Sequence, residues 1–277
     1  MKPELWSTIE SDQHDVKLVV CDMDGTLLDG DGRVPDGFWP VVDAMHERGI
    51  IFAPASGRQH ATLARLFAAR DTISTFVADN GTHVVRDGES VSFSPIERET
   101  AERAIDLVRA ADHRDIGLVA GGTKSAYVER GDARFVDEAA IFNVDLVVVD
   151  DLKDVDDDFL KMATFDFNGV EDIVDDIFPG QWDGHQVVLS GTHWIDIMSS
   201  NANKGTAVAD LQEHLGITPA ETVVFGDFLN DLEMMSQGDL SFAMENAHPQ
   251  ILASANYVAP KNTDHGVVAV LSRLLRL

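Results

Sequence analysis

Two aspartates one residue apart, Asp22 and Asp24, end an apolar segment that runs from Val16 to Cys21. The length and composition of this segment predict a buried strand. Residues i and i+2 of an extended chain point to the same side, so both carboxylates are expected to face one crevice. Two neighbouring carboxylates repel each other unless a cation, a shared proton or a reaction stabilises them. The pair therefore favours a functional site, whereas a polar turn is enough to explain the glycines and aspartates of residues 29–32.

Strand and helix signals alternate toward both ends of the chain. Strands are expected at 16–21, 50–53, 76–78, 222–226 and 240–244, and helices at 36–48, 59–70, 204–215, 231–236 and 265–277. Such alternation predicts an α/β fold in which helices cover both faces of a doubly wound parallel sheet. In these folds ligands bind beyond the carboxyl ends of the strands.

The middle of the chain has a different pattern, in which hairpins and helices are mixed. Hairpins are expected around Asp87–Gly88 and over 187–198, helices over 95–111 and 170–178, and strands at 116–119, 126–128, 144–149 and 162–167. The pattern predicts an α+β domain over 83–190. This domain would be inserted into a discontinuous core domain made of 1–82 and 191–277.

The composition excludes several classes of partner and location. The 277 residues include 21 basic and 48 acidic side chains, which give a net charge of −27. Neither nucleic acid nor a membrane surface is an expected partner, because binding either one needs a basic surface. No run of about 18 apolar residues predicts a transmembrane helix, and no apolar signal core follows the N-terminus, so a cytoplasmic protein is expected. Cys21 is the only cysteine, which excludes an internal disulfide.

Polar clusters follow the expected strands at four places. They are Asp22 with Asp24, Ser56 in a Ser-Gly-Arg tripeptide, Lys204 at the start of a helix, and Asp227 with Asn230 and Asp231. Each cluster alone has a structural explanation, because Asn203 is a good N-cap for the helix and acidic residues complement the dipole where a helix starts. The occurrence of all four at strand ends, in this order, favours a single shared site.

The four clusters resemble the four motifs of the haloacid dehalogenase (HAD) superfamily of phosphatases. The inserted segment resembles the large α/β cap (C2B-type) of its Cof-type subgroup, in which the approach of the cap determines specificity. The likeness covers the whole chain, including residues 78–84 and 243–267. The chain departs from the pattern at Phe228, where relatives often carry a smaller or polar residue.

The resemblance implies roles for the core residues. Asp22 would be the nucleophile that forms an aspartyl phosphate, and Asp24 the acid and base that serves the leaving oxygen and then the attacking water. Mg²⁺ would be held by the carboxylates of Asp22 and Asp227 and by the backbone carbonyl of Asp24, because this ion prefers oxygen ligands. Asn230 and Asp231 would support these ligands, directly or through water.

The phosphoryl oxygens would be bound by a second set of residues, namely Thr26, Ser56, Gly57 and Lys204. Three further residues are weaker candidates for contacts with the rest of the substrate. For Arg58 an ordinary role at the surface or at a helix start stays open, and for His83 an ordinary histidine is the favoured interpretation. Lys124 lies in the inserted domain, after two glycines.

The function that the resemblance implies is hydrolysis of a small phosphorylated metabolite, with a sugar phosphate as the leading candidate. A phosphomutase or phosphotransferase is the alternative within enzymes, and a sensor that binds a phosphorylated ligand without turnover is a third. A response-regulator receiver also clusters aspartates with a lysine, but it is about half as long and has no large insertion. Neither the substrate nor the oligomeric state follows from the sequence.

Overall fold

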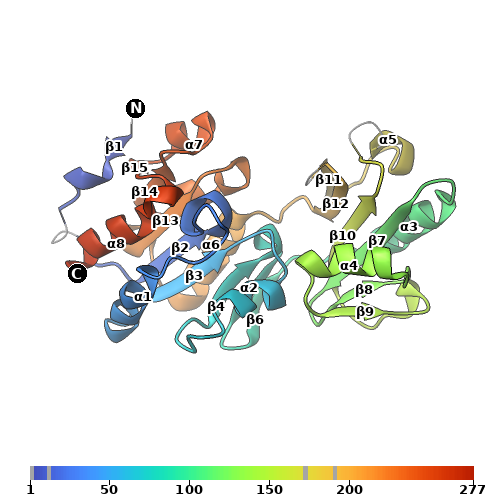
Figure 1. Cartoon of the computed structure of the whole chain (residues 1–277), viewed down its shortest axis with the longest axis horizontal. Coiled ribbons are helices and arrows are strands. Elements are labelled where there is room, and N and C mark those ends of the chain that lie inside the picture. The colour runs from blue at the N-terminus through green and yellow to red at the C-terminus, as the bar shows by residue number, and fades with distance from the viewer. Residues whose placement is uncertain (1–2, 11–13, 171–173, 190–191) are drawn as a thin grey trace. The chain divides into compact units, whose positions relative to one another are not determined.

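The structure is a computed structural model that describes residues 3–10, 14–170, 174–189 and 192–277 (Figure 1). The chain divides into two compact units. The first consists of Met1–Ser92 and Asn203–Leu277, and the second is Phe93–Ala202. None of the helices in the described ranges is long and apolar enough to cross a membrane.

The first unit is built on a nine-stranded sheet in the order β1-β15-β14-β13-β2-β3-β4-β5-β6. Its strands are β1 (Glu4–Leu5), β2 (Leu18–Asp22), β3 (Ile51–Ala55), β4 (Thr75–Ala78), β5 (His83–Arg86), β6 (Glu89–Phe93), β13 (Thr222–Gly226), β14 (Leu240–Met244) and β15 (Tyr257–Ala259). The pairs from β1 to β4 are parallel, and β5 is antiparallel to β4. The parallel pairs confirm the predicted fold class.

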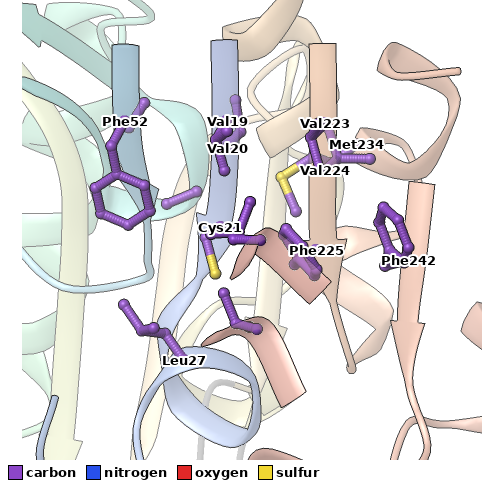
Figure 2. Packing of buried hydrophobic residues seen from close by; sticks show 14 of the residues in the cluster. Val19, Val20, Cys21, Leu27, Phe52, Val223, Val224, Phe225, Met234 and Phe242 are labelled. Carbon is purple, nitrogen blue, oxygen red and sulfur yellow. The ribbon is translucent and has the colours of Figure 1, made fainter. Parts of the chain in front are cut away.

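The strand β2 lies at the centre of this sheet, between β13 and β3. All five of its residues are buried, because both faces are covered and both edges are paired. Figure 2 shows the surrounding core, with Phe52 of β3 on one side of β2 and Phe225 of β13 on the other. This burial explains why the sequence of β2 is an unbroken apolar run up to Asp22.

The helices of the first unit are α1 (Phe38–Glu47), α2 (His60–Leu66), α6 (Lys204–Leu215), α7 (Pro249–Ser254) and α8 (Gly266–Leu275). α1 packs against α8 and β3, α2 packs against β4, and α6 packs against β4 and β5. The buried stripe of α1 is the one that its spacing predicts, namely Phe38, Val41, Val42 and Met45.

The second unit has its own six-stranded sheet in the order β11-β12-β10-β7-β8-β9. Its strands are β7 (Ile116–Gly122), β8 (Ala126–Val128), β9 (Leu146–Val148), β10 (Phe159–Asp166), β11 (His185–Leu189) and β12 (Trp194–Ser199), and its helices are α3 (Arg98–Ala110), α4 (Ala133–Phe142) and α5 (Val174–Ile177). Two buried clusters stabilise it, one with side chains of α3 and one with side chains of α4. The inserted α+β unit thus has cores of its own.

The structure differs from the sequence-based expectations in two places. The inserted unit spans 93–202 in place of the expected 83–190, because β5 pairs with β4 of the first unit and β12 pairs with β10 of the second. The helix expected at 231–236 is replaced by two short 3-10 turns, Leu229–Asp231 and Met234–Gln237. The helix expected at 170–178 is described only in part, as α5, because residues 171–173 lie outside the described residues.

Substitutions at two glycines of β7 test how α4 packs on this strand in the second unit. A Cβ on Gly117 would lie 2.4 Å from the ring of Phe135 in α4, whereas the nearest atom to a Cβ on Gly121 is 3.6 Å away. We expect Gly117→Ala to lower the free energy of unfolding by roughly 1–3 kcal/mol, as overpacking does. Gly121→Ala should leave it unchanged or raise it, because alanine loses less backbone entropy than glycine. Urea unfolding measures both, and equal midpoints would contradict the packing of α4 on β7.

Candidate active site

Three neighbouring parallel strands end at the same edge of the first unit's sheet and carry the polar clusters. Asp22 is the last residue of β2, Ser56 follows β3, and Asp227 follows β13. Lys204, the first residue of α6, reaches the same place, since its Nζ lies 2.5 Å from Oδ1 of Asp22. The structure therefore brings together residues that are up to 205 positions apart in the sequence.

The ammonium of Lys204 is the centre of this arrangement. It is fully buried and donates to Oδ1 of Asp22 at 2.5 Å and to Oδ1 of Asp231 at 2.7 Å. The other oxygen of Asp231 accepts hydrogen bonds from the backbone N–H groups of Asp227 (2.9 Å) and Phe228 (3.2 Å). Asn203 caps α6 by accepting from the N–H of Thr206 at 2.8 Å, so the cap positions the lysine that follows it.

Three carboxylates surround this one ammonium. Ligand oxygens of Asp22, Asp227 and Asp231 lie within 4.8 Å of one another. Burial, with the charge of Asp231, raises the pKa of Asp22 to about 8, and the same two causes raise the pKa of Asp227 to about 6. Burial alone would lower the pKa of Lys204, but Asp22 and Asp231 outweigh it and raise that pKa. The surplus of negative charge and the all-oxygen donor set fit a divalent cation such as Mg²⁺.

The turn after β2 is shaped by the contact with Asp227. Gly25 has φ of +84°, and a Cβ on it would lie 2.3 Å from Oδ2 of Asp227, so no other residue fits there. Thr26 donates from its hydroxyl to Oδ1 of Asp227 at 3.1 Å. The side chain of Asn246, a residue that the sequence analysis missed, donates to the carbonyl of Gly25 at 2.8 Å and holds the turn from the other side.

Asp24 does not join the carboxylate cluster. The chain leaves β2 after Asp22 and turns, and the carboxylate of Asp24 accepts two hydrogen bonds from Arg58, at 2.7 Å from Nη2 and 3.2 Å from Nε. The backbone N–H of Arg58 donates to Oγ of Ser56 at 3.2 Å, and Ser56 is buried. Arg58 therefore holds the expected acid and base in place, a contact that spacing alone did not indicate.

The remaining candidates have other surroundings. His83 is buried and its Nε2 lies 2.8 Å from Oγ of Ser90, as expected for an ordinary core histidine. Lys124 lies in the second unit, where its Nζ donates to the carbonyl of Asp156 at 2.7 Å beside a cavity of about 300 Å³. Phe228 is 58% exposed, and its ring meets that of His248 edge to face at 6.0 Å.

The loop after β4 contributes a residue that the sequence analysis did not single out. Asn80 accepts a hydrogen bond from Nδ2 of Asn230 at 3.0 Å. The backbone N–H of Asn80 also donates to the carbonyl of Ser56 at 2.9 Å. The signal available in the sequence was Asn-Gly directly after a strand, which is typical of left-handed turns.

The fold and the site together define an α/β enzyme whose carboxylates gather where parallel strands end. Residues 19–271 match the family model of the haloacid dehalogenase-like hydrolases, and the chain belongs to this family, as its motifs predicted. It is a phosphatase of this family.

Similar proteins include the 5-amino-6-(5-phospho-D-ribitylamino)uracil phosphatase YbjI of Escherichia coli (strain K12). It is 30% identical over 267 residues, which are 94% of this chain and 97% of that protein. The HMP-PP phosphatase of Enterobacter sp. (strain 638) is 23% identical over 245 residues, with 87% and 89% covered. Among solved structures, TM0651 from Thermotoga maritima is 25% identical and has a TM-score of 0.81, with 93% of this chain and 97% of that chain covered.

The carboxylate cluster predicts a pH-dependent stability of the metal-free protein. The pKa of Asp22 is about 8 in the folded chain, whereas an aspartate in an unfolded chain has a pKa of about 3.9. Between these values the carboxyl of Asp22 binds more protons in the folded state than in the unfolded state, so its contribution to stability is most favourable at low pH and falls as the pH rises through this range.

We therefore expect Asp22→Asn to raise the Tm at pH 8 in chelator and to flatten the Tm profile between pH 5 and pH 8. Calorimetry across this range measures the effect. The exposed Asp112→Asn is the matched control and should follow the wild type. A profile of Asp22→Asn that coincides with the wild type would show that the carboxylate is not destabilised by burial.

Proposed function

We propose that the chain is a Mg²⁺-dependent phosphatase that hydrolyses a small phosphorylated metabolite through an aspartyl phosphate on Asp22. The observation that carries the proposal is the buried carboxylate of Asp22, paired with Lys204 at the end of the central strand and within reach of Asp227. The names of two relatives, phosphatases of a phosphoribitylamino-uracil and of HMP-PP, support a small phosphorylated substrate. A sugar phosphate, or a phosphorylated sugar alcohol like the one in the first of these names, is the leading candidate.

The carboxylates of Asp22 and Asp227, with the backbone carbonyl of Asp24, would hold the metal ion. When bound, Mg²⁺ reduces the repulsion between a carboxylate and a phosphate dianion. Asp231 would support these ligands, because one of its oxygens is bound by Lys204 and the other by backbone N–H groups. It holds the lysine and the loop that carries Asp227.

The reaction needs two carboxylates in two roles. An oxygen of Asp22 attacks phosphorus, the bond from phosphorus to the leaving oxygen breaks, and Asp24 gives a proton to that oxygen. Water then attacks the phosphorus of the acyl phosphate, Asp24 takes a proton from it, and Asp22 and inorganic phosphate are released. Ser56 and Lys204 stabilise the phosphoryl oxygens. Arg58 binds both oxygens of Asp24 and so orients this carboxylate, which keeps a free lone pair on each oxygen for the proton.

Phosphate release tests the proposal. A panel of phosphorylated metabolites is incubated with the protein in Mg²⁺, and inorganic phosphate is measured. We expect release from at least one sugar or sugar-alcohol phosphate, loss of release in chelator, and recovery with Mg²⁺ but not with Ca²⁺, whose larger and looser shell disturbs the in-line geometry.

The Asp22→Asn variant should release no inorganic phosphate, because an amide is a poor nucleophile. The Asp112→Asn variant should keep full activity. Near-wild-type release by Asp22→Asn would rule out the covalent mechanism. Transfer of the phosphoryl group to a second sugar hydroxyl, without release, would make the protein a mutase.

The Asp24→Asn variant distinguishes the two steps of the reaction, formation of the aspartyl phosphate and its hydrolysis. A sugar alkoxide needs a proton to leave, whereas nitrophenolate leaves almost unaided, so the first step should fall by about 10²–10⁴-fold with the sugar phosphate and much less with nitrophenyl phosphate. Hydrolysis of the aspartyl phosphate lacks its base with both substrates. Rapid-mixing experiments should therefore show a burst of nitrophenol that equals the enzyme concentration. Equal losses without a burst would assign the acid and base to another residue.

A further inference from the structure

The loop that follows β4 has an unusual backbone. Asp79, Asn80 and Gly81 all have positive φ, at 47°, 56° and 92°. Apart from glycine, asparagine, aspartate and histidine are the residues that adopt this region most often. At Gly81 no side chain fits, because a Cβ would lie 2.3 Å from the carbonyl oxygen of Asn203. Such a run persists only where the surrounding contacts hold it, so its contacts are informative.

Backbone hydrogen bonds join this loop to the Ser-Gly-Arg segment. The N–H of Asp79 donates to the carbonyl of Arg58 at 2.9 Å, and the N–H of Asn80 donates to the carbonyl of Ser56 at 2.9 Å. The side-chain amide of Asn80 lies over Gly57, where a Cβ would be 3.1 Å from Nδ2. The position of Asn80 and that of the phosphate-binding segment are therefore fixed together.

The side chain of Asn80 joins a second loop. Its Oδ1 accepts a hydrogen bond from Nδ2 of Asn230 at 3.0 Å. Asn230 follows β13, which is separated from β4 by β2 and β3. Neighbouring strands are about 4.8 Å apart, so the ends of β4 and β13 are about 14 Å apart. The two amides meet because their loops fold toward each other across the ends of β2 and β3, where Asp22 and Ser56 lie.

We propose that Asn80 is a positioning residue, whose amide locks the phosphate-binding segment to the loop that carries Asp227. The inference rests on the proposed function and adds a residue to it. Asn230 is the neighbour of Asp231, which binds Lys204, so the amide pair connects Asn80 to the residues that hold Asp22. The residue must tolerate positive φ and present a neutral acceptor, and asparagine meets both requirements.

Three substitutions distinguish the contribution of the backbone conformation at residue 80 from that of the side-chain hydrogen bond. Asn80→Gly keeps the left-handed backbone and removes the amide, Asn80→Asp keeps the acceptor oxygen and adds a negative charge, and Asn230→Ala removes the donor. We expect Asn80→Gly to lower kcat by up to about 10²-fold with a much smaller change in KM, because a shift of about 1 Å in reacting groups has that cost. Asn80→Asp should keep more of kcat but raise KM, because its charge repels phosphate.

A double-mutant cycle tests the coupling between the two amides. The variant with both Asn80→Gly and Asn230→Ala should be no slower than the slower single variant, and the losses of Tm in chelator should likewise be smaller than additive. Asp87→Gly is the matched control, because Asp87, in the turn between β5 and β6, also has positive φ (52°) but accepts a hydrogen bond from Ser74, which precedes β4. It should keep full activity.

Wild-type kcat in Asn80→Gly, or fully additive losses in both cycles, would overturn the proposal. The Tm cycle needs no turnover, so it tests the contact independently of the proposed function. If the wild type released phosphate from no substrate, the proposed function would fail, whereas the coupling of Asn80 with Asn230 would still be decided by the Tm cycle.

Discussion

The site depends on one buried ammonium. Lys204 is fully buried between the carboxylates of Asp22 and Asp231, and it thereby joins the start of α6 to the ends of β2 and β13. An ammonium buried this completely needs a charged partner, and Asp231 remains one when the carboxyl of Asp22 is neutral. The same ammonium orients Asp22, the proposed nucleophile, and through Asp231 it anchors the loop of Asp227.

The balance of charge around that ammonium is unfavourable without a further cation. Three carboxylates gather where one lysine is present, and burial opposes the ionisation of Asp22 and Asp227. A sequence selected for stability alone would not place them together, whereas one selected for phosphoryl transfer must. Local conflict of this kind is typical of functional sites and is offset by the well-packed sheet beneath.

Much of the fold and of the candidate site was predictable from the sequence, because the signals for them come from residues that are close together in the chain. The apolar run of β2, the stripe of α1 and the cap at Asn203 each follow from neighbouring residues, and the motifs around Asp22 and Asp227 identified the family. The contacts that were missed join distant segments. The pairing of Arg58 with Asp24 depends on how the chain turns after β2, and the bond between Asn80 and Asn230 spans 150 positions. The assignment of β5 to the first sheet also depends on a partner strand, which a hairpin signal does not specify.

The chain returns from the inserted unit at Ala202, and α6 begins at Lys204. A single residue, Asn203, thus separates a unit with its own cores from the lysine that binds Asp22. Its side chain and backbone are bound to Thr206 by reciprocal hydrogen bonds of 2.8 and 3.3 Å. These bonds fix the backbone of Asn203 at the first turn of α6, directly before the lysine. The point where the inserted segment ends is therefore also the point where the ammonium is positioned, by contacts that all lie within the first unit.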